Sequence, residues 1–195
     1  MTDNTARIVL LIGFAVVTPI GIYHRLRAAT GERLDRRQEG WWILLTMRPL
    51  ALLTLIATAA YIVRPGSMAW SSVPLPGWLR WAGVALGIAA AGLLVWTFRA
   101  LGRNLTDTVV TRRNASLVTN GPYRWVRHPF YVSFALGAIA NALVTANWIL
   151  AITGIGVFVL LAIRARIEER NLIARFGREY EEYMTRTGRF LPRLS

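Results

Sequence analysis

Long apolar runs alternate with arginine-rich segments along the chain of 195 residues. The runs cover residues 8–23, 41–63, 78–98 and 130–163, and their only charged residues are Arg48 in the second run and Arg80 in the third. A helix needs roughly 20 predominantly apolar residues to cross a hydrocarbon core of about 30 Å. The pattern therefore predicts an all-α fold made of membrane-spanning helices.

The fourth run is long enough for two helices. It holds 34 residues without a charge, which is too many for one span and fits two short ones. We expect the break at residues 145–147, with Trp148 anchored at the membrane surface. The chain is thus predicted to be a multi-pass integral membrane protein with five transmembrane helices, the last two forming a hairpin. The first run lacks the flanks of a cleaved signal peptide, so we interpret it as a retained span.

Composition agrees with a membrane protein and narrows its chemistry. The chain is 54% hydrophobic and 17% charged, whereas a soluble domain carries charge on about a quarter of its residues. It has no cysteine, which excludes disulfides and thiolate metal sites. The net charge is +13, and all 23 basic residues are arginine. These arginines bracket the apolar runs instead of lining one face, so we do not expect nucleic-acid binding.

The arginine distribution predicts the orientation in the membrane. Segments 24–40, 99–128 and 164–195 hold 5, 6 and 8 arginines, a total of 19. The opposite side holds only Arg7, Arg64 and Arg80. Arginine and lysine accumulate in cytoplasmic loops. We therefore expect the N-terminus outside and the C-terminus in the cytoplasm.

Two features inside the spans have structural interpretations. Gly83, Gly87 and Ala91 place small residues on one helix face, which favours close helix packing, either within the chain or between subunits. Arg48 lies seven residues after Trp41. A charged residue in a span either extends to the headgroups or faces a cavity or partner, and both remain open for Arg48.

Polar chemistry is concentrated in two segments on the predicted cytoplasmic side. One is 121–131 (GPYRWVRHPFY), which joins a basic loop to the fourth run; the other is the tail from Arg164. The tail predicts a helix that ends before Gly177 and a second helical piece at 179–183. Glu168 and Glu169 are adjacent and point about 100° apart on a helix, so we expect at most one to face inward. An ordinary amphipathic tail with a Glu168–Arg164 surface pair is the alternative interpretation.

Taken together, the motifs of the two segments resemble the isoprenylcysteine carboxyl methyltransferase family of integral-membrane methyltransferases. The motifs that carry the resemblance are Gly121-Pro-Tyr-Arg-x-x-Arg-His-Pro-x-Tyr131, Glu168-Glu169, Phe176-Gly-x-Glu-Tyr180-x-x-Tyr183, Leu101-Gly-Arg-Asn-Leu-Thr106, Leu117-Val-Thr-Asn-Gly121 and Arg189-Phe-Leu-Pro192. The resemblance covers residues 99–192. It departs at Ser133, where the family motif commonly has glycine.

This resemblance implies a cytoplasmic pocket for S-adenosylmethionine between the start of the fourth run and the C-terminal helix. The implied cofactor contacts are Leu117, Val118, Gly121, Tyr123, His128, Tyr131, Glu168 and Glu169. Glu168 and Arg164 are the expected catalytic residues: Arg164, or alternatively Arg166, would fix an acceptor carboxylate, and Glu168 would be the base if the acceptor were an amine. No metal site is expected, because only His24 and His128 are available as histidine ligands.

The implied reaction is carboxyl O-methylation of an isoprenylcysteine-like compound that enters from the bilayer. The expected partners are this lipophilic substrate and the membrane lipids around the protein. Methylation of a lipid amine or a thiol is the nearest alternative. A NADPH-dependent membrane reductase and a non-enzymatic membrane scaffold are further alternatives. We expect residues 1–98 to form a three-span region and residues 99–195 to form the catalytic half.

Overall fold

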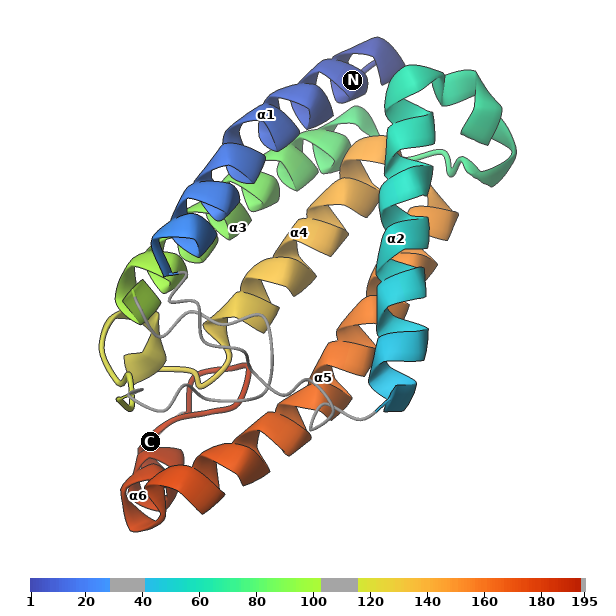
Figure 1. The fold of residues 1–195 in the computed structure, drawn as a ribbon. Coiled ribbons are helices and arrows are strands. Elements are labelled where there is room, and N and C mark those ends of the chain that lie inside the picture. Colours follow the sequence, from blue (N-terminus) through green and yellow to red (C-terminus); the bar gives the residue numbers. More distant parts are fainter. Residues whose placement is uncertain (29–40, 103–115, 194–195) are drawn as a thin grey trace.

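The computed structural model describes residues 1–28, 41–102 and 116–193 (Figure 1). Its elements in chain order are α1 (Asp3–Ala28), α2 (Trp41–Val63), the 3-10 helix η2 (Pro65–Ser71), α3 (Gly77–Leu101), the 3-10 helix η4 (Gly121–Arg124), α4 (Pro129–Thr145), α5 (Trp148–Phe176) and α6 (Arg178–Arg186). Within these residues the only β-type pairings are two isolated bridges. The predicted all-α architecture is confirmed.

Four helices, α1, α2, α3 and α5, are long and apolar enough to cross a membrane. Helix α4 has 17 residues, so it is about 26 Å long at 1.5 Å per residue, slightly short of a hydrocarbon core of about 30 Å. It packs between α3 and α5. A fifth span in α4 therefore remains a prediction.

The predicted break between the last two helices is confirmed. Helix α4 ends at Thr145, and Ala146 has a positive φ of 50° that reverses the chain. The Oδ1 atom of Asn147 accepts hydrogen bonds from the backbone N–H groups of Ile149 (3.1 Å) and Leu150 (3.3 Å) and so caps α5. Its Nδ2 atom donates to the Ser71 hydroxyl at 2.7 Å. The hairpin is thereby fastened to η2.

Close packing of α3 on α4 explains the small residues of α3. A Cβ atom on Gly83 would lie 2.8 Å from Cβ of Leu143, and one on Gly87 would lie 3.6 Å from Cβ of Ala140. The sequence left open whether these small residues pack within the chain or between subunits, and the structure shows packing within the chain. The absence of a side chain at Gly83 allows the two backbones to approach.

Arg80 joins the helices at the end of the bundle that holds the N-terminus. Its side chain is 10% exposed and donates to the Asp3 carboxylate (2.9 Å), the Met1 carbonyl (3.0 Å) and the Val144 carbonyl (3.0 Å). It also donates to the Tyr61 hydroxyl at 3.2 Å. The sequence suggested only a charge on the outer side, whereas Arg80 is a buried cross-link between α1, α2, α3 and α4.

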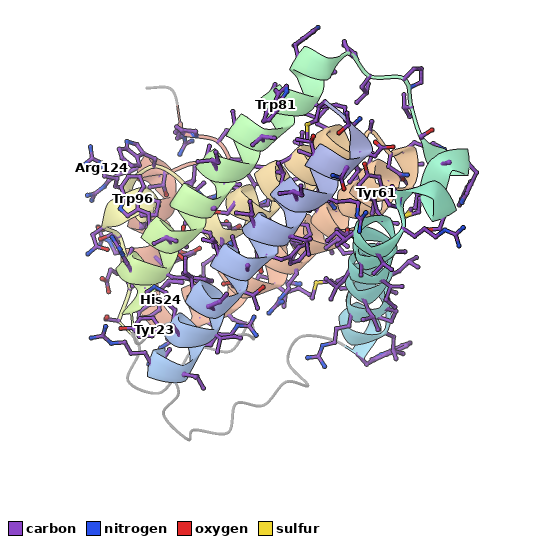
Figure 2. The ribbon with its side chains drawn as sticks, turned by 90° about the horizontal axis from the view of Figure 1, so that it is seen from above. Tyr23, His24, Tyr61, Trp81, Trp96 and Arg124 are labelled. Atoms are coloured by element: carbon purple, nitrogen blue, oxygen red, sulfur yellow. The ribbon has the colours of Figure 1, made fainter. Side chains whose placement is uncertain are left out.

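The opposite end of the bundle carries the arginines in the last turns of α1, α3, η4 and α6, and α6 lies at the end away from the N-terminus (Figure 1). Figure 2 shows Tyr23, His24, Trp96 and Arg124 at this end, away from Tyr61 and Trp81. Arg48 is exposed near the start of α2, which favours a side chain that extends toward the headgroups. We call this the arginine-rich end.

Candidate functional site

The site is built around the first turn of α4. Pro129 occupies the first helical position, where its missing N–H group costs nothing, and His128 is the N-cap residue. Tyr131 follows three residues later, so its ring lies over the same turn. The rings of His128 and Tyr131 stack with their centroids 5.2 Å apart and an angle of 10° between their planes. The hydroxyl of Ser133 donates to the Pro129 carbonyl at 2.9 Å, which accommodates this departure from the family motif.

Glu169 on α5 is buried against this turn, with 3% of its surface exposed. Its carboxylate accepts hydrogen bonds from Nε of Arg127 (2.8 Å) and Nε of Arg189 (3.0 Å). Nε2 of His128 lies 3.3 Å from the same carboxylate. The charge of Glu169 is therefore balanced inside the protein, as a buried carboxylate requires.

Glu168 faces the same turn from a more open position. Its side chain is 30% exposed, and its Oε2 atom accepts a hydrogen bond from the Tyr131 hydroxyl at 2.8 Å. Nδ1 of His128 lies 3.9 Å from that oxygen. We expected at most one inward-facing glutamate, but the structure brings both to the start of α4. The His128 ring lies between the two carboxylates: its Nε2 atom faces Glu169, and its Nδ1 atom faces Glu168.

Four ionisable groups around the two glutamates have shifted pKa values. Burial, and next the negative charge of Glu168, raise the pKa of Tyr123 well above its usual value. Burial, and next the charge of Glu169, raise the pKa of Tyr180 in the same direction. Burial raises the pKa of Tyr183 to about 12. Hydrogen bonding to Glu169 raises the pKa of Arg189. The three tyrosines are thus neutral hydrogen-bond donors, and Arg189 stays charged.

A surface recess of about 360 Å³ lies beside this cluster. Its lining includes Leu117, Tyr183 and Thr187. The Tyr183 hydroxyl donates to the Tyr123 carbonyl at 2.6 Å, and the Thr187 carbonyl accepts from the guanidinium of Arg127. The hydrogen bond between Arg127 and Thr187 therefore joins the recess wall to the glutamate cluster, although neither glutamate of that cluster, nor His128 or Tyr131, lines the recess.

The remaining predicted residues have different positions. Val118 is half-buried in the segment before η4. Gly121 has a φ of 59°, and a Cβ atom there would lie 3.0 Å from Cβ of Ala100, so it packs on the end of α3. Arg164 is half-buried and lies one helical turn before Glu168. The part of the Leu101–Thr106 motif beyond Gly102 lies outside the described residues.

Sequence reasoning did not assign Arg127 and Arg189 to the site. Arg127 stands inside the motif at 121–131, and a buried carboxylate nearby requires a cation, which is a signal that could have identified it. Arg189 is 20 residues from Glu169 in the sequence. No local pattern joins the two, because their contact depends on the return of the chain after α6.

These features define a multi-pass integral membrane protein whose polar cluster lies at one end of a helical bundle. Residues 83–174 match the isoprenylcysteine carboxyl methyltransferase (ICMT) family. The solved structure of the eukaryotic intramembrane Ras methyltransferase ICMT has a similar fold, with a TM-score of 0.59 and 23% sequence identity. That similarity covers 74% of this chain and 52% of the other.

Two bacterial relatives illustrate the range of similar proteins. The cobalt-zinc-cadmium resistance protein CzcN of Cupriavidus metallidurans is 32% identical over 123 residues, which are 61% of this chain and 56% of that protein. Methanethiol S-methyltransferase 1 of Bradyrhizobium diazoefficiens is 24% identical, and the alignment covers 98% of this chain and 70% of that enzyme. The chain thus spans little more than half the length of the resistance protein. Within its described part we find no group of three or more His, Cys, Asp and Glu residues arranged to hold a metal ion.

Proposed function

We propose that this protein is an S-adenosylmethionine-dependent methyltransferase that acts on a lipophilic acceptor, by carboxyl O-methylation of an isoprenylcysteine-like compound. The observation that carries the proposal is the convergence of Glu168, His128 and Tyr131 at the first turn of α4. These residues belong to the region that matches the family. They combine an accessible carboxylate with two stacked rings.

The residues present fit this cofactor. The part-exposed Glu168 carboxylate suits ribose hydroxyls or an amino group, because a carboxylate accepts several hydrogen bonds. It also offsets a sulfonium charge. Tyr123, whose pKa is raised, and Tyr131, whose hydroxyl donates to Glu168, provide rings and hydroxyl groups beside it. Leu117 in the recess wall, and the backbone of Val118 and Gly121 nearby, complete the set of proposed contacts.

When bound, S-adenosylmethionine supplies an electrophilic methyl group and leaves as S-adenosylhomocysteine. The protein contributes binding and orientation, which account for much of the rate of a displacement reaction. Glu168, His128 and Tyr131 hold the cofactor end. We assign Glu169 a positioning role instead of a direct contact, because two arginines and His128 already surround its carboxylate.

Arg164 is the proposed acceptor-binding residue. It is the first charged residue after the apolar part of α5 and lies one turn before Glu168. A guanidinium binds a carboxylate through two parallel hydrogen bonds, so Arg164 would hold the acceptor carboxylate where the apolar helix surface ends. A carboxylate needs no general base: it attacks the methyl carbon, and a methyl ester forms without proton transfer. The acceptor would enter from the bilayer and the cofactor from the cytoplasm.

Thiol S-methylation is the second candidate. It is favoured by the alignment with methanethiol S-methyltransferase 1, which covers 98% of this chain. In this reaction the thiol loses its proton and the thiolate attacks the methyl carbon. Arg164 would then stabilise the thiolate, since a nearby arginine lowers the pKa of a thiol.

Calorimetric binding to the detergent-purified protein tests the function. We expect S-adenosylmethionine and S-adenosylhomocysteine to bind and NADPH to give no signal. His128→Ala and Glu168→Gln should each weaken cofactor binding at least about tenfold, a loss of about 1.4 kcal/mol, in a protein that stays folded. Glu181→Gln on the exposed side of α6 makes the same chemical change outside the cluster and should bind as the wild type does.

Two results would contradict the proposal. No cofactor binding by a folded wild-type protein would remove the methyltransferase function and favour the reductase or the scaffold. Unchanged cofactor affinity in both His128→Ala and Glu168→Gln would show that the cofactor binds elsewhere.

A further inference from the structure

The chain returns to the site after α6. Residues 187–190, which we call the C-terminal strap, lie beside the segment that leads into α4. The backbone N–H of Gly188 donates to the Trp125 carbonyl at 3.1 Å, and those of Arg127 and His128 donate to Gly188 (2.9 Å) and Arg189 (3.1 Å). A Cβ atom on Gly188 would overlap the Leu191 carbonyl, so the tight turn that follows requires glycine at this position. The backbone of the strap is therefore fixed against His128.

The side chains of the next two residues, Arg189 and Phe190, contact different parts of the site. Arg189 forms an ion pair with Glu169 and is 35% exposed. Phe190 is half-buried, and its ring centroid lies 5.8 Å from that of His128 and 5.6 Å from that of Phe158. Since Phe158 belongs to the apolar part of α5, the Phe190 ring contacts both the polar cluster and an apolar helix surface.

The surroundings of Phe190 on the apolar side are aromatic and aliphatic. It packs on a buried cluster formed by Tyr131, Val157, Leu161 and Ala165. The cluster is bordered by side chains that are only partly buried: Met47, Leu50, Ala51, Phe130 and Phe134. An apolar molecule that approached His128 from the bundle interior would meet the rings of Tyr131 and Phe190.

We propose that Phe190 determines how large an apolar acceptor the site accepts, because its ring contacts both His128 and the apolar part of α5. This inference rests on the proposed function. A smaller side chain at position 190 extends the apolar space toward the methyl donor, and a larger one shortens it. Arg189 holds the strap in place on the other side through Glu169.

The test compares acceptors of increasing size with purified protein in lipid nanodiscs. The probes are N-acetyl-S-alkylcysteines and free alkanethiols, each with chains from methyl to dodecyl, together with S-adenosylmethionine. For the series that the wild type methylates, we measure the ratio of kcat/KM for the longest chain to that for the shortest. Phe190→Ala should raise this ratio at least about tenfold, since one or a few methylenes in an apolar pocket are worth that much. Phe190→Trp should lower it.

The control is Leu191→Ala, which truncates an apolar side chain at the next position, where the residue is 78% exposed. It should leave the ratio unchanged. The affinity for S-adenosylhomocysteine should stay within about twofold in all three variants, because the substitutions lie on the side of the site where the acceptor is proposed to bind. If Phe190→Ala does not fold, the test rests on Phe190→Trp, which should lower the ratio relative to the wild type.

The outcomes separate this inference from the function on which it rests. A wild type that binds cofactor and methylates a probe, with equal ratios in wild type and both Phe190 variants, overturns the role of Phe190 and leaves the methyltransferase intact. A uniform loss of activity for all chain lengths, with the ratio preserved, also overturns it, because Phe190 would then be only structural. A folded wild type that binds no S-adenosylhomocysteine overturns both proposals.

Discussion

Glu168 and Glu169 show how two neighbouring residues of the same type acquire different roles. Glu169 has 3% of its surface exposed and is surrounded by Arg127, Arg189 and His128. Glu168 keeps 30% of its side chain exposed and shares its hydrogen bond with one tyrosine. A carboxylate with its charge already balanced suits a structural role, and an accessible one suits ligand binding. The difference arises from the helix angle between adjacent positions.

This difference predicts effects of unequal size for the same substitution at the two positions. Glu169→Gln leaves two guanidinium groups without their anion, and breaking a buried ion pair costs about 3 kcal/mol in the free energy of unfolding. Glu168→Gln should change that free energy by less than about 1 kcal/mol, because its carboxylate is partly solvated. Denaturant unfolding in detergent measures both. Equal losses of stability in the two variants would contradict the assigned roles.

The two segments that hold this cluster could be located from hydropathy, and the family resemblance pointed to the individual residues. His128, Tyr131 and the two glutamates stand in short motifs at the ends of apolar runs, where polar chemistry meets the membrane. Arg189 belongs to the tail, and its pairing with Glu169 depends on the turn at Gly188 and on backbone contacts with Trp125. Such a contact between distant segments leaves no periodic or local signal. The cofactor and catalytic roles themselves remain predictions.

At the scale of helices, α3 and α4 share the most extensive contact among the described helices, and the small Gly83 lies within it. We expect Gly83→Ala to lower the free energy of unfolding by about 1–3 kcal/mol, because an added methyl group has no space beside Leu143. Gly92→Ala on the same helix is the control, since nothing lies within 4 Å of a Cβ atom there. It should have a neutral or slightly favourable effect, as alanine is the better helix former. Comparable destabilisation by both changes would show that packing on α4 is not the cause.

The helices themselves were largely predictable from the chain. Apolar length gave the five helices and the division of the fourth run, because 34 uncharged residues exceed one span. Hydropathy did not predict the cross-link formed by Arg80, which was interpreted only as a charge of the outer side. Its hydrogen bonds to Met1, Asp3 and Val144 bring together residues from the beginning, middle and later part of the chain. Hydropathy contains no information on such a cross-link.

At the scale of the whole molecule, the two ends of the bundle have different chemistry. The end with the N-terminus is closed by Arg80 and by the Asn147 cap, which use their polar atoms internally. The arginine-rich end contains the glutamate cluster, the recess and the strap. A water-soluble cofactor and a lipophilic acceptor would therefore meet at one end only. The orientation of the chain in the membrane therefore determines whether the proposed cofactor site faces the cytoplasm.

The predicted orientation follows from the 19 arginines on one side against 3 on the other. It can be tested with single cysteines, because the chain has none of its own. Ser67→Cys places a thiol on exposed η2, and Thr185→Cys places one on exposed α6 at the arginine-rich end. In intact cells a membrane-impermeant maleimide should label Ser67→Cys, and it should label Thr185→Cys only after permeabilisation. The reverse pattern would place the proposed cofactor site outside the cytoplasm, where S-adenosylmethionine would have to be supplied from another source, and would contradict the division of access proposed for cofactor and acceptor.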